Sequence, residues 1–368
     1  MTTWIRSIGT ALPEYSIAQS DAALLAQKLR ITERWHDALP ALYRKSGVQR
    51  RGSVLLLNGD EADEQRQLFY PHSDVSPRGP TTSVRMKAYA QHAGPLLEQA
   101  SINAIDASQL SRSSLTHLVT VSCTGFVSPG IDHWLIDRLG LETTVQRTHV
   151  GFMGCHGIIN GIRVANAIAS SDPSATVLVA AVELCSLHQQ YSEDPQQLVA
   201  NALFADGAAS VVVSALTEEV ARSPERWRVV SSSSWKIPNT TTHMAWTVGD
   251  YGFEMKLSPE VPAIIEAHLK GPFEQWLATH GLNSKEIGMW AIHPGGPRIL
   301  DSVERTFELS QSQVQPSRDV LGDYGNMSSP TVLFILKRML AIDADSRNCV
   351  LLAFGPGLHA EAILLSRE

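Results

Sequence analysis

Cysteine is scarce in this sequence, and its occurrences are far apart. Four cysteines occur in 368 residues. Four thiols are too few for a disulfide framework in a chain of this length, and no Cys-x-x-Cys pair suggests a zinc site. We therefore expect reduced thiols, no metal ion and a cytoplasmic protein.

Long apolar runs and an excess of basic residues are also missing. No uninterrupted apolar run of about 18 residues could span a membrane, and the first residues lack the basic and apolar regions of a signal peptide. The net charge of −7 argues against nucleic acid as the main partner. A hydrophobic content of 43% allows a large buried core. These properties are typical of a soluble intracellular enzyme.

The most informative segment, residues 151–161, places one cysteine between glycines. A strand over 145–150 is expected to end there, and a helix over 158–169 to follow. Cys155 would then lie at a helix N-terminus, where the helix dipole favours negative charge and is expected to lower the pKa of the thiol. This pattern predicts a nucleophile, although a buried cysteine that only fills space beside a turn would have the same sequence.

Two later segments each present one polar side chain next to a regular element. A buried strand over 287–292 is expected to lead to His293 and then to a helix over 299–309. Asn326 precedes an apolar helix predicted over 331–340. Taken singly, the histidine could be a core residue and the asparagine a helix cap.

An internal repeat connects these segments. A strand over 115–121 is expected to end at Cys123, just as the later strand ends at His293. Nearly equal spacings then separate Cys123 from Cys155 and His293 from Asn326. Self-similarity of this kind predicts two related structural units in one chain.

The two units indicate the fold class. Strands that are continuous runs of Val, Leu and Ala, alternating with helices, are typical of mostly parallel sheets in an α/β protein. We place the units at residues 1–218 and 219–368. Because ligands of such folds bind beyond the carboxyl ends of the strands, Cys155, His293 and Asn326 are expected to share one pocket between the two units.

Three segments resemble the signatures of a known family. Gly-Phe-Met-Gly-Cys at 151–155, Ile-His-Pro-Gly-Gly-Pro at 292–297 and Tyr-Gly-Asn-Met-Ser-Ser at 324–329 resemble those of type III polyketide synthases, the chalcone synthase superfamily on the thiolase fold. Residues 202–209 and 353–358 extend the similarity. The resemblance implies two thiolase-like halves, five layers in the order αβαβα with mostly parallel mixed sheets, and a homodimer.

The resemblance also implies a reaction. Cys155 would take an acyl group from coenzyme A, and a protonated His293 would stabilise its thiolate. His293 and Asn326 would then donate hydrogen bonds to the enolate that forms when malonyl-CoA loses carbon dioxide. The implied enzyme is an acyltransferase with acyl-CoA and malonyl-CoA as substrates and no cofactor.

Further positions are implied to surround the substrates. By the resemblance, Phe204 lies at the mouth between a coenzyme A tunnel and the cavity, Met255 replaces an aromatic residue of plant enzymes, and Trp246 replaces a glycine. The residues implied for the pocket are Phe204, Cys123, Thr124, Cys185, His188, Trp246, Met255 and Ser328. Those implied for coenzyme A binding are Lys45 and Arg50, in a basic cluster suited to phosphate, with Gly295 and Gly296.

The product class is the least determined prediction. Residues 182–188 and 244–253 resemble bacterial alkylresorcinol and alkylpyrone synthases, which implies a fatty acyl-CoA starter. A malonyl-primed aromatic synthase of the tetrahydroxynaphthalene type, a β-ketoacyl-carrier-protein synthase III-like enzyme, a catalytically silent thiolase-fold subunit and a Cys/His hydrolase stay open. Glu183, a charge within an apolar strand, requires a buried partner that the sequence does not identify.

Overall fold

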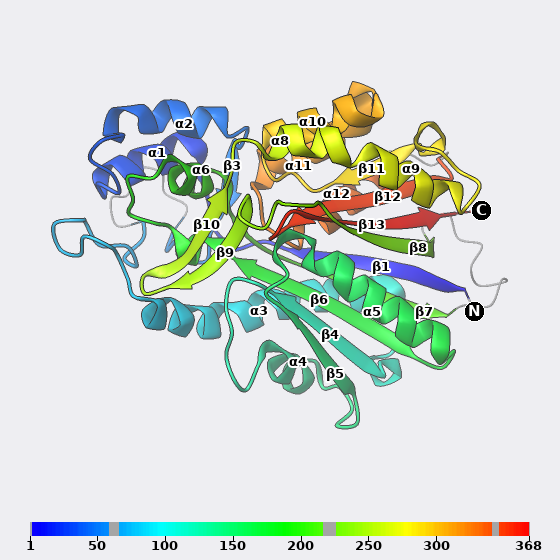
Figure 1. Ribbon diagram of the computed structural model, residues 1–368. Helices are drawn as coiled ribbons and strands as arrows, with labels where there is room; N and C mark the ends of the chain where they lie inside the picture. The colour runs from blue at the N-terminus through cyan, green and yellow to red at the C-terminus, as the bar shows by residue number, and fades with distance from the viewer. Residues whose placement is uncertain (1, 59–65, 216–225, 341–345, 368) are drawn as a thin grey trace.

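A single mixed sheet of nine strands organises the protein. The computed structural model describes residues 2–58, 66–215, 226–340 and 346–367, and its sheet has the order β11-β12-β13-β8-β1-β7-β6-β4-β5 (Figure 1). Its strands are β1 (Thr3–Ala11), β4 (His117–Ser122), β5 (Gln146–Gly151), β6 (Thr176–Leu184), β7 (Asp206–Ala215), β8 (Trp227–Lys236), β11 (Met289–Ile292), β12 (Asn348–Gly355) and β13 (His359–Ser366).

The strand directions correct one expectation. Only the pairs β4–β5, β4–β6 and β11–β12 are parallel, whereas the five other pairs of this sheet are antiparallel. The α/β class is confirmed, but the prediction of mostly parallel strands is wrong. A continuous apolar run reports that both faces of a strand are buried, and helices cover both faces here whatever the direction of the strand.

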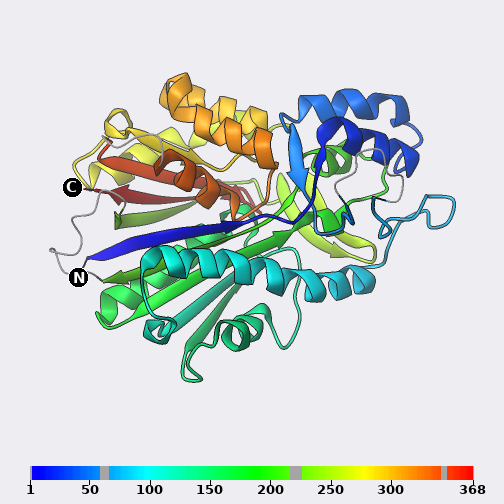
Figure 2. The same cartoon turned by 180° about the vertical axis from the view of Figure 1, so that it is seen from behind.

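Helices lie in three layers separated by the two parts of the sheet. The central layer consists of α5 (Gly157–Ser171) and α12 (Thr331–Leu340), which share one hydrophobic core with strands from both parts. A second core lies between β4, β6 and β7 and the outer helices α3 (Thr82–Ser108) and α4 (Ile131–Leu139). Seen from behind, α3 is the long cyan helix that crosses this part of the sheet (Figure 2).

The other outer layer covers the C-terminal strands. It contains α8 (Val261–His268), α9 (Lys270–Ala278) and α10 (Pro297–Phe307), which pack on β11, β12 and β13 in a third core, while α11 (Gln311–Tyr324) packs beside α10 and α12. The order of helix, sheet, helix, sheet and helix agrees with the five layers that the resemblance implied.

The smaller elements gather at the end of the molecule opposite both termini (Figure 1). They are β2 (Ser16–Ala18), α1 (Gln19–Lys28), α2 (Leu39–Lys45), β3 (Arg50–Gly52), α6 (Pro195–Leu203), β9 (Met244–Gly249) and β10 (Gly252–Leu257). The predicted boundary between residues 218 and 219 lies outside the described residues, so the division into 1–218 and 219–368 stays a prediction. Among the helices of the described ranges, none is long and apolar enough to cross a membrane.

Candidate active site

Cys155 lies in a short 3-10 turn, Gly154–His156, between β5 and α5. Gly154 has a φ of 72°, and a Cβ atom there would lie 2.5 Å from Cδ of Pro356, so the turn requires glycine. The thiol therefore lies at the start of α5, as the sequence predicts. Burial nevertheless raises the pKa of Cys155 to about 12. Desolvation of the thiolate therefore opposes the lowering of this pKa that the helix dipole was predicted to cause.

One hydroxyl group contacts two thiols. Ser328 Oγ lies 3.5 Å from Sγ of Cys155 and 3.4 Å from Sγ of Cys123. Ser328 has a φ of 55°, and its backbone N–H donates to Oδ1 of Asn326 at 2.8 Å. The Asn326 side chain therefore holds the turn that brings Ser328 against the Cys155 loop.

Two backbone hydrogen bonds hold Asn326 in place, and its side-chain Nδ2 group has no partner in the described structure. Its N–H donates to the carbonyl of Leu203 and its carbonyl accepts from the N–H of Ala205, both at 2.9 Å. The side chain is 1% exposed. Oδ1 is occupied by the turn, whereas the Nδ2 donor has no hydrogen bond to any described residue. The free donor is the group that the sequence analysis assigned to the enolate.

His293 directly follows β11, and its N–H donates to the carbonyl of Leu352 at 2.8 Å. Its side chain is 1% exposed, and neither ring nitrogen has a hydrogen-bond partner in the described part of the chain. Burial, together with the nearby His156, lowers the pKa of His293 to about 3. A buried imidazole without partners is costly, and a ligand that supplies them would explain it.

Of the three residues of the predicted triad, only Cys155 lines the cavity described below, so the structure does not show the one shared pocket that the sequence predicts. Cys155, His293 and Asn326 make no hydrogen bonds among themselves in the described structure. The charge of His156, the residue after Cys155, lowers the pKa of His293. The His293 ring therefore lies within electrostatic range of the loop that carries the thiol.

Cys155 faces a small cavity, and seven of the eight predicted pocket residues line it. The full lining is Cys123, Thr124, Gly154, Cys155, Cys185, Phe204, Met244, Trp246, Met255, Ser328, Gly355 and Pro356. The sequence analysis missed the roles of Gly154, Met244, Gly355 and Pro356. The last two lie in the segment 353–358 that carried the resemblance, which is the signal that could have found them.

Glu183 in β6 finds hydrogen-bond donors and no cation within the described ranges. Its buried carboxylate accepts from the backbone N–H of Cys123 at 2.9 Å, Oγ1 of Thr124 at 2.7 Å and Oγ of Ser329 at 2.8 Å. Burial raises the pKa of Glu183, and these bonds act in the opposite direction. The carboxylate connects the loop after β4 to the loop before α12 and so supports two sides of the cavity.

His188, the eighth predicted pocket residue, lines a neighbouring cavity and not the one at Cys155. Its Nε2 lies 2.6 Å from the carbonyl of Thr124, and its Nδ1 accepts from the N–H of Phe253 at 3.0 Å. The ring stacks on Phe253 with centroids 4.1 Å apart. Trp246 packs edge-on against it and donates from Nε1 to the carbonyl of Cys123 at 2.7 Å. The wall is therefore rigidly hydrogen-bonded.

Comparison with known proteins identifies the family of this arrangement. The sequence pattern of the chalcone and stilbene synthases, N-terminal domain, matches residues 2–216, and that of their C-terminal domain matches residues 228–367. The chain belongs to this family. It is therefore a type III polyketide synthase, a transferase that joins coenzyme A thioesters by decarboxylative condensation and needs no further cofactor.

Relatives and solved structures resemble the synthase along its whole length. The alpha-pyrone synthesis polyketide synthase-like Pks18 of Mycobacterium tuberculosis is 31% identical, with 98% of this chain and 90% of that protein covered. The 1,3,6,8-tetrahydroxynaphthalene synthase of Streptomyces peucetius is 32% identical, with 99% and 93% covered. The crystal structure of PKS-I from the brown alga Ectocarpus siliculosus superposes with a TM-score of 0.92 at 29% identity, covering 100% of this chain and 98% of that one.

This membership selects the polyketide synthase from the families that the sequence left open. It sets aside the carrier-protein synthase, the silent subunit and the hydrolase. It does not decide between a fatty acyl and a malonyl starter, because relatives named for both pyrones and tetrahydroxynaphthalene are similar to this synthase to the same degree.

An apolar groove on the synthase contains three of the four positions predicted for coenzyme A. Lys45, Gly295 and Gly296 line it. Arg50 does not, because its side chain lies on β3 and donates to Oγ of Ser16 at 3.1 Å. Leu203 lines the groove while the next residue, Phe204, lines the Cys155 cavity. Phe204 thus lies between groove and cavity, and its position at the mouth of a coenzyme A tunnel stays a prediction.

Proposed function

We propose that the synthase loads a fatty acyl-CoA starter on Cys155, extends it with malonyl-CoA and cyclises the product to an alkylresorcinol or an alkylpyrone. The observation that carries this proposal is a second cavity beside the first. Cys185, Phe204, Trp246 and Met255 line both, so a chain attached to Cys155 can continue from one cavity into the other.

The second cavity has a lining suited to a hydrocarbon chain. Its far part is lined by aliphatic side chains, Ile17, Ala22, Leu25, Ala26, Leu29, Leu55 and Leu56. Transfer of a long alkyl chain from water to such a lining is favourable, whereas a malonyl starter has no apolar surface to place there.

We also propose that the thiol of Cys155 gives its proton to His293. Burial alone keeps both groups neutral, since it raises the pKa of Cys155 to about 12 and lowers that of His293 to about 3. Transfer of the proton creates two opposite charges in a site of low dielectric, where each charge stabilises the other. The unpartnered ring nitrogens of His293 support this assignment.

The same ring and Asn326 then serve the condensation. As malonyl-CoA loses carbon dioxide, negative charge develops on the thioester oxygen, and the Nε2–H of His293 with the Nδ2–H of Asn326 would donate to it. The resulting carbanion attacks the acyl thioester, and the thiolate of Cys155 leaves. One such donor typically contributes about 3 kcal/mol to the stabilisation of the transition state.

A product assay with matched variants tests which acyl-CoA starters the synthase uses. The purified synthase is given malonyl-CoA and acyl-CoA starters from acetyl to palmitoyl, with Cys155→Ala as the blank. Leu25→Trp narrows the second cavity, whereas Leu24→Trp places the same ring on the exposed side of α1, where Leu24 is 53% exposed. We expect long-chain products from the wild type and from Leu24→Trp, and only short starters to be used by Leu25→Trp. Equal chain-length profiles in the two variants would contradict this use of the cavity.

We propose further that the synthase is a cytoplasmic homodimer. β5 is an edge strand with mostly exposed side chains, and Phe126 and Phe152, both exposed, pack against the ring of Phe253. Exposed strand edges and apolar patches are usually covered by a partner. The free cysteines fit a reducing compartment. Sedimentation equilibrium should give twice the chain mass, and Phe152→Asp should lower it to one chain mass.

A further inference from the structure

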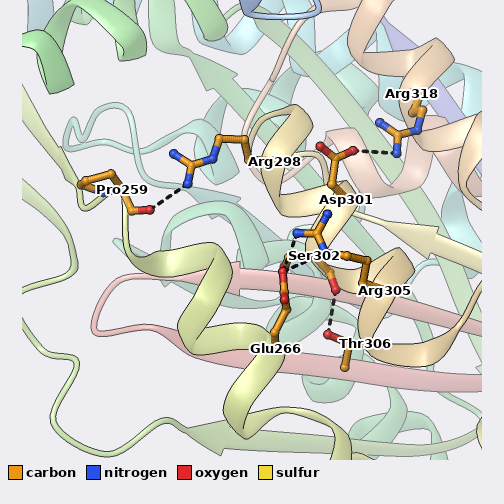
Figure 3. Close-up of polar contacts among 8 residues, drawn as sticks. All are labelled: Pro259, Glu266, Arg298, Asp301, Ser302, Arg305, Thr306 and Arg318. Carbon is orange, nitrogen blue, oxygen red and sulfur yellow. Dashed lines mark hydrogen bonds and ion pairs between the residues drawn. The ribbon is translucent and has the colours of Figure 1, made fainter.

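Three arginines on α10 and α11 differ in what neutralises their charge (Figure 3). Arg305 on α10 forms an ion pair with Glu266 of α8, and Arg318 on α11 forms one with Asp301 of α10. Arg298, at the start of α10, has no carboxylate partner within the described residues. Its charge is thus available to a ligand, whereas the charges of the other two are used within the fold.

The local setting of Arg298 makes its free charge unusual. It is the second residue of α10, and the first turn of this helix contains no acidic residue. The positive end of a helix dipole ordinarily disfavours a cation by about 0.3 to 1 kcal/mol. Here the dipole and the guanidinium act together on the same side of the groove, which favours an anion.

The guanidinium is held at the groove by one contact. Its Nη2 donates to the backbone carbonyl of Pro259 at 3.2 Å, and both residues line the groove. The close-up shows this bond, with the other nitrogen atoms of Arg298 pointing to no residue that is drawn (Figure 3). These nitrogens remain free to donate to a ligand.

The rest of the groove supplies little competing charge. Lys45 of α2 is the other cation among its described lining residues, and the α2 positions beside it, Ala38 and Ala41, are uncharged. The groove lining also contains one carboxylate, that of Asp194, which accepts from the N–H of Gln196 at 2.9 Å as the cap of α6 and keeps its negative charge. An anionic ligand in the groove therefore meets one cation from α2 and one from α10.

We propose that Arg298 binds a phosphate group of the coenzyme A moiety in the thioester substrates. The inference rests on the use of coenzyme A thioesters by this synthase. A guanidinium can hold phosphate through two parallel hydrogen bonds, which lysine cannot. Arg298 recognises the carrier and not the acyl group, so it acts on substrate binding and leaves the chemical steps at Cys155 unchanged.

Arg298→Gln tests the charge while keeping a donor for the carbonyl of Pro259. We expect the KM for malonyl-CoA to rise about tenfold with kcat unchanged, as for loss of a charge-assisted hydrogen bond. With the N-acetylcysteamine thioester of malonate, which lacks phosphate, the variant should equal the wild type. Arg298→Lys should recover part of the lost affinity. Arg305→Gln, on the same helix but paired with Glu266, is the matched control and should change neither KM.

The 3′-dephospho form of malonyl-CoA identifies which phosphate group Arg298 contacts. Sensitivity to Arg298→Gln that disappears with this substrate assigns the 3′-phosphate, and sensitivity that persists assigns the pyrophosphate. The proposal is overturned if Arg298→Gln and Arg305→Gln have the same KM for malonyl-CoA, or if the phosphate-free thioester is equally affected. Calorimetric titration of coenzyme A into both variants measures the contact without turnover, so a failure of the proposed starter and product would be seen separately.

Discussion

Two buried histidines differ in their hydrogen bonds. His188 and His293 are both buried, and burial lowers the pKa of each to about 3. His188 uses both ring nitrogens, one toward Thr124 and the other toward Phe253, whereas His293 uses neither in the described structure. Burial and pKa therefore do not distinguish a structural histidine from a reactive one here, but the supply of partners does.

The same difference separates the wall of the Cys155 cavity from the predicted catalytic residues His293 and Asn326, which we call the reactive corner. In the wall, the carboxylate of Glu183 and the indole of Trp246 are hydrogen-bonded. In the corner, His293 and the Nδ2 group of Asn326 are not. Unpaired polar groups destabilise a fold, and they are expected where a substrate completes the bonding.

The largest expected effect is on kcat, when each of the two histidines is replaced with leucine. His293→Leu removes the proposed proton acceptor and one enolate donor, so we expect kcat to fall at least about 10²-fold to 10³-fold. His188→Leu changes a residue that lines the second cavity and not the one at Cys155, so it should keep kcat with a short starter within about tenfold. Steady-state product formation from malonyl-CoA measures both. A larger loss in His188→Leu would break the comparison.

Stability should change in the opposite order. His188→Leu leaves the carbonyl of Thr124 and the N–H of Phe253 without partners, which should cost about 2 to 4 kcal/mol of unfolding free energy. His293→Leu removes an imidazole that has no partners, so its stability should equal or exceed that of the wild type. Urea unfolding followed by tryptophan fluorescence measures both. Equal losses would show that His293 has structural partners after all.

A smaller effect is expected on the pH dependence of Cys155 alkylation, which tests whether His293 accepts the proton of the thiol. Because burial raises the pKa of Cys155, its thiolate becomes more abundant as the pH rises, and in His293→Leu iodoacetamide labelling should accelerate about tenfold per pH unit. With the proposed proton transfer to His293, labelling of the wild type at pH 7 should be at least about tenfold faster than labelling of the variant. The gap should narrow toward pH 10. Identical profiles would exclude proton transfer to His293.

Individual helices and strands were predictable where the hydrophobic periodicity and the flanking glycine, proline or polar residues indicate the same bounds. The helix predicted over 331–340 has these bounds in the structure, and the strand predicted over 145–150 differs from β5 by one residue at each end. Strand direction was not predictable, because an apolar run is the same in a parallel and an antiparallel pair. The partner of β1 in the other half, β8, is an example, since no local pattern encodes their pairing.

The site was predictable in its loops but not in its charges. Sequence signatures led to the turns at Cys155, His293 and Asn326, since glycine and small residues are required there. They did not separate Arg50, which bonds to Ser16 away from the groove, from Arg298, which lines it. Both are basic residues next to a regular element, and only the packing of α10 against α8 decides which charge stays free.

The sequence by itself determined the family, the residue types of the reactive corner and the position of the thiol at a helix start, because these depend on residues near one another in the chain. The tertiary structure decided which polar groups have partners, how strongly burial shifts their pKa values and where a second cavity joins the first. These properties arise from contacts between segments far apart in sequence, such as Ser328 with Cys155 and Thr124 with Glu183. Local patterns cannot specify such contacts, because each depends on how whole layers of helix and sheet pack together.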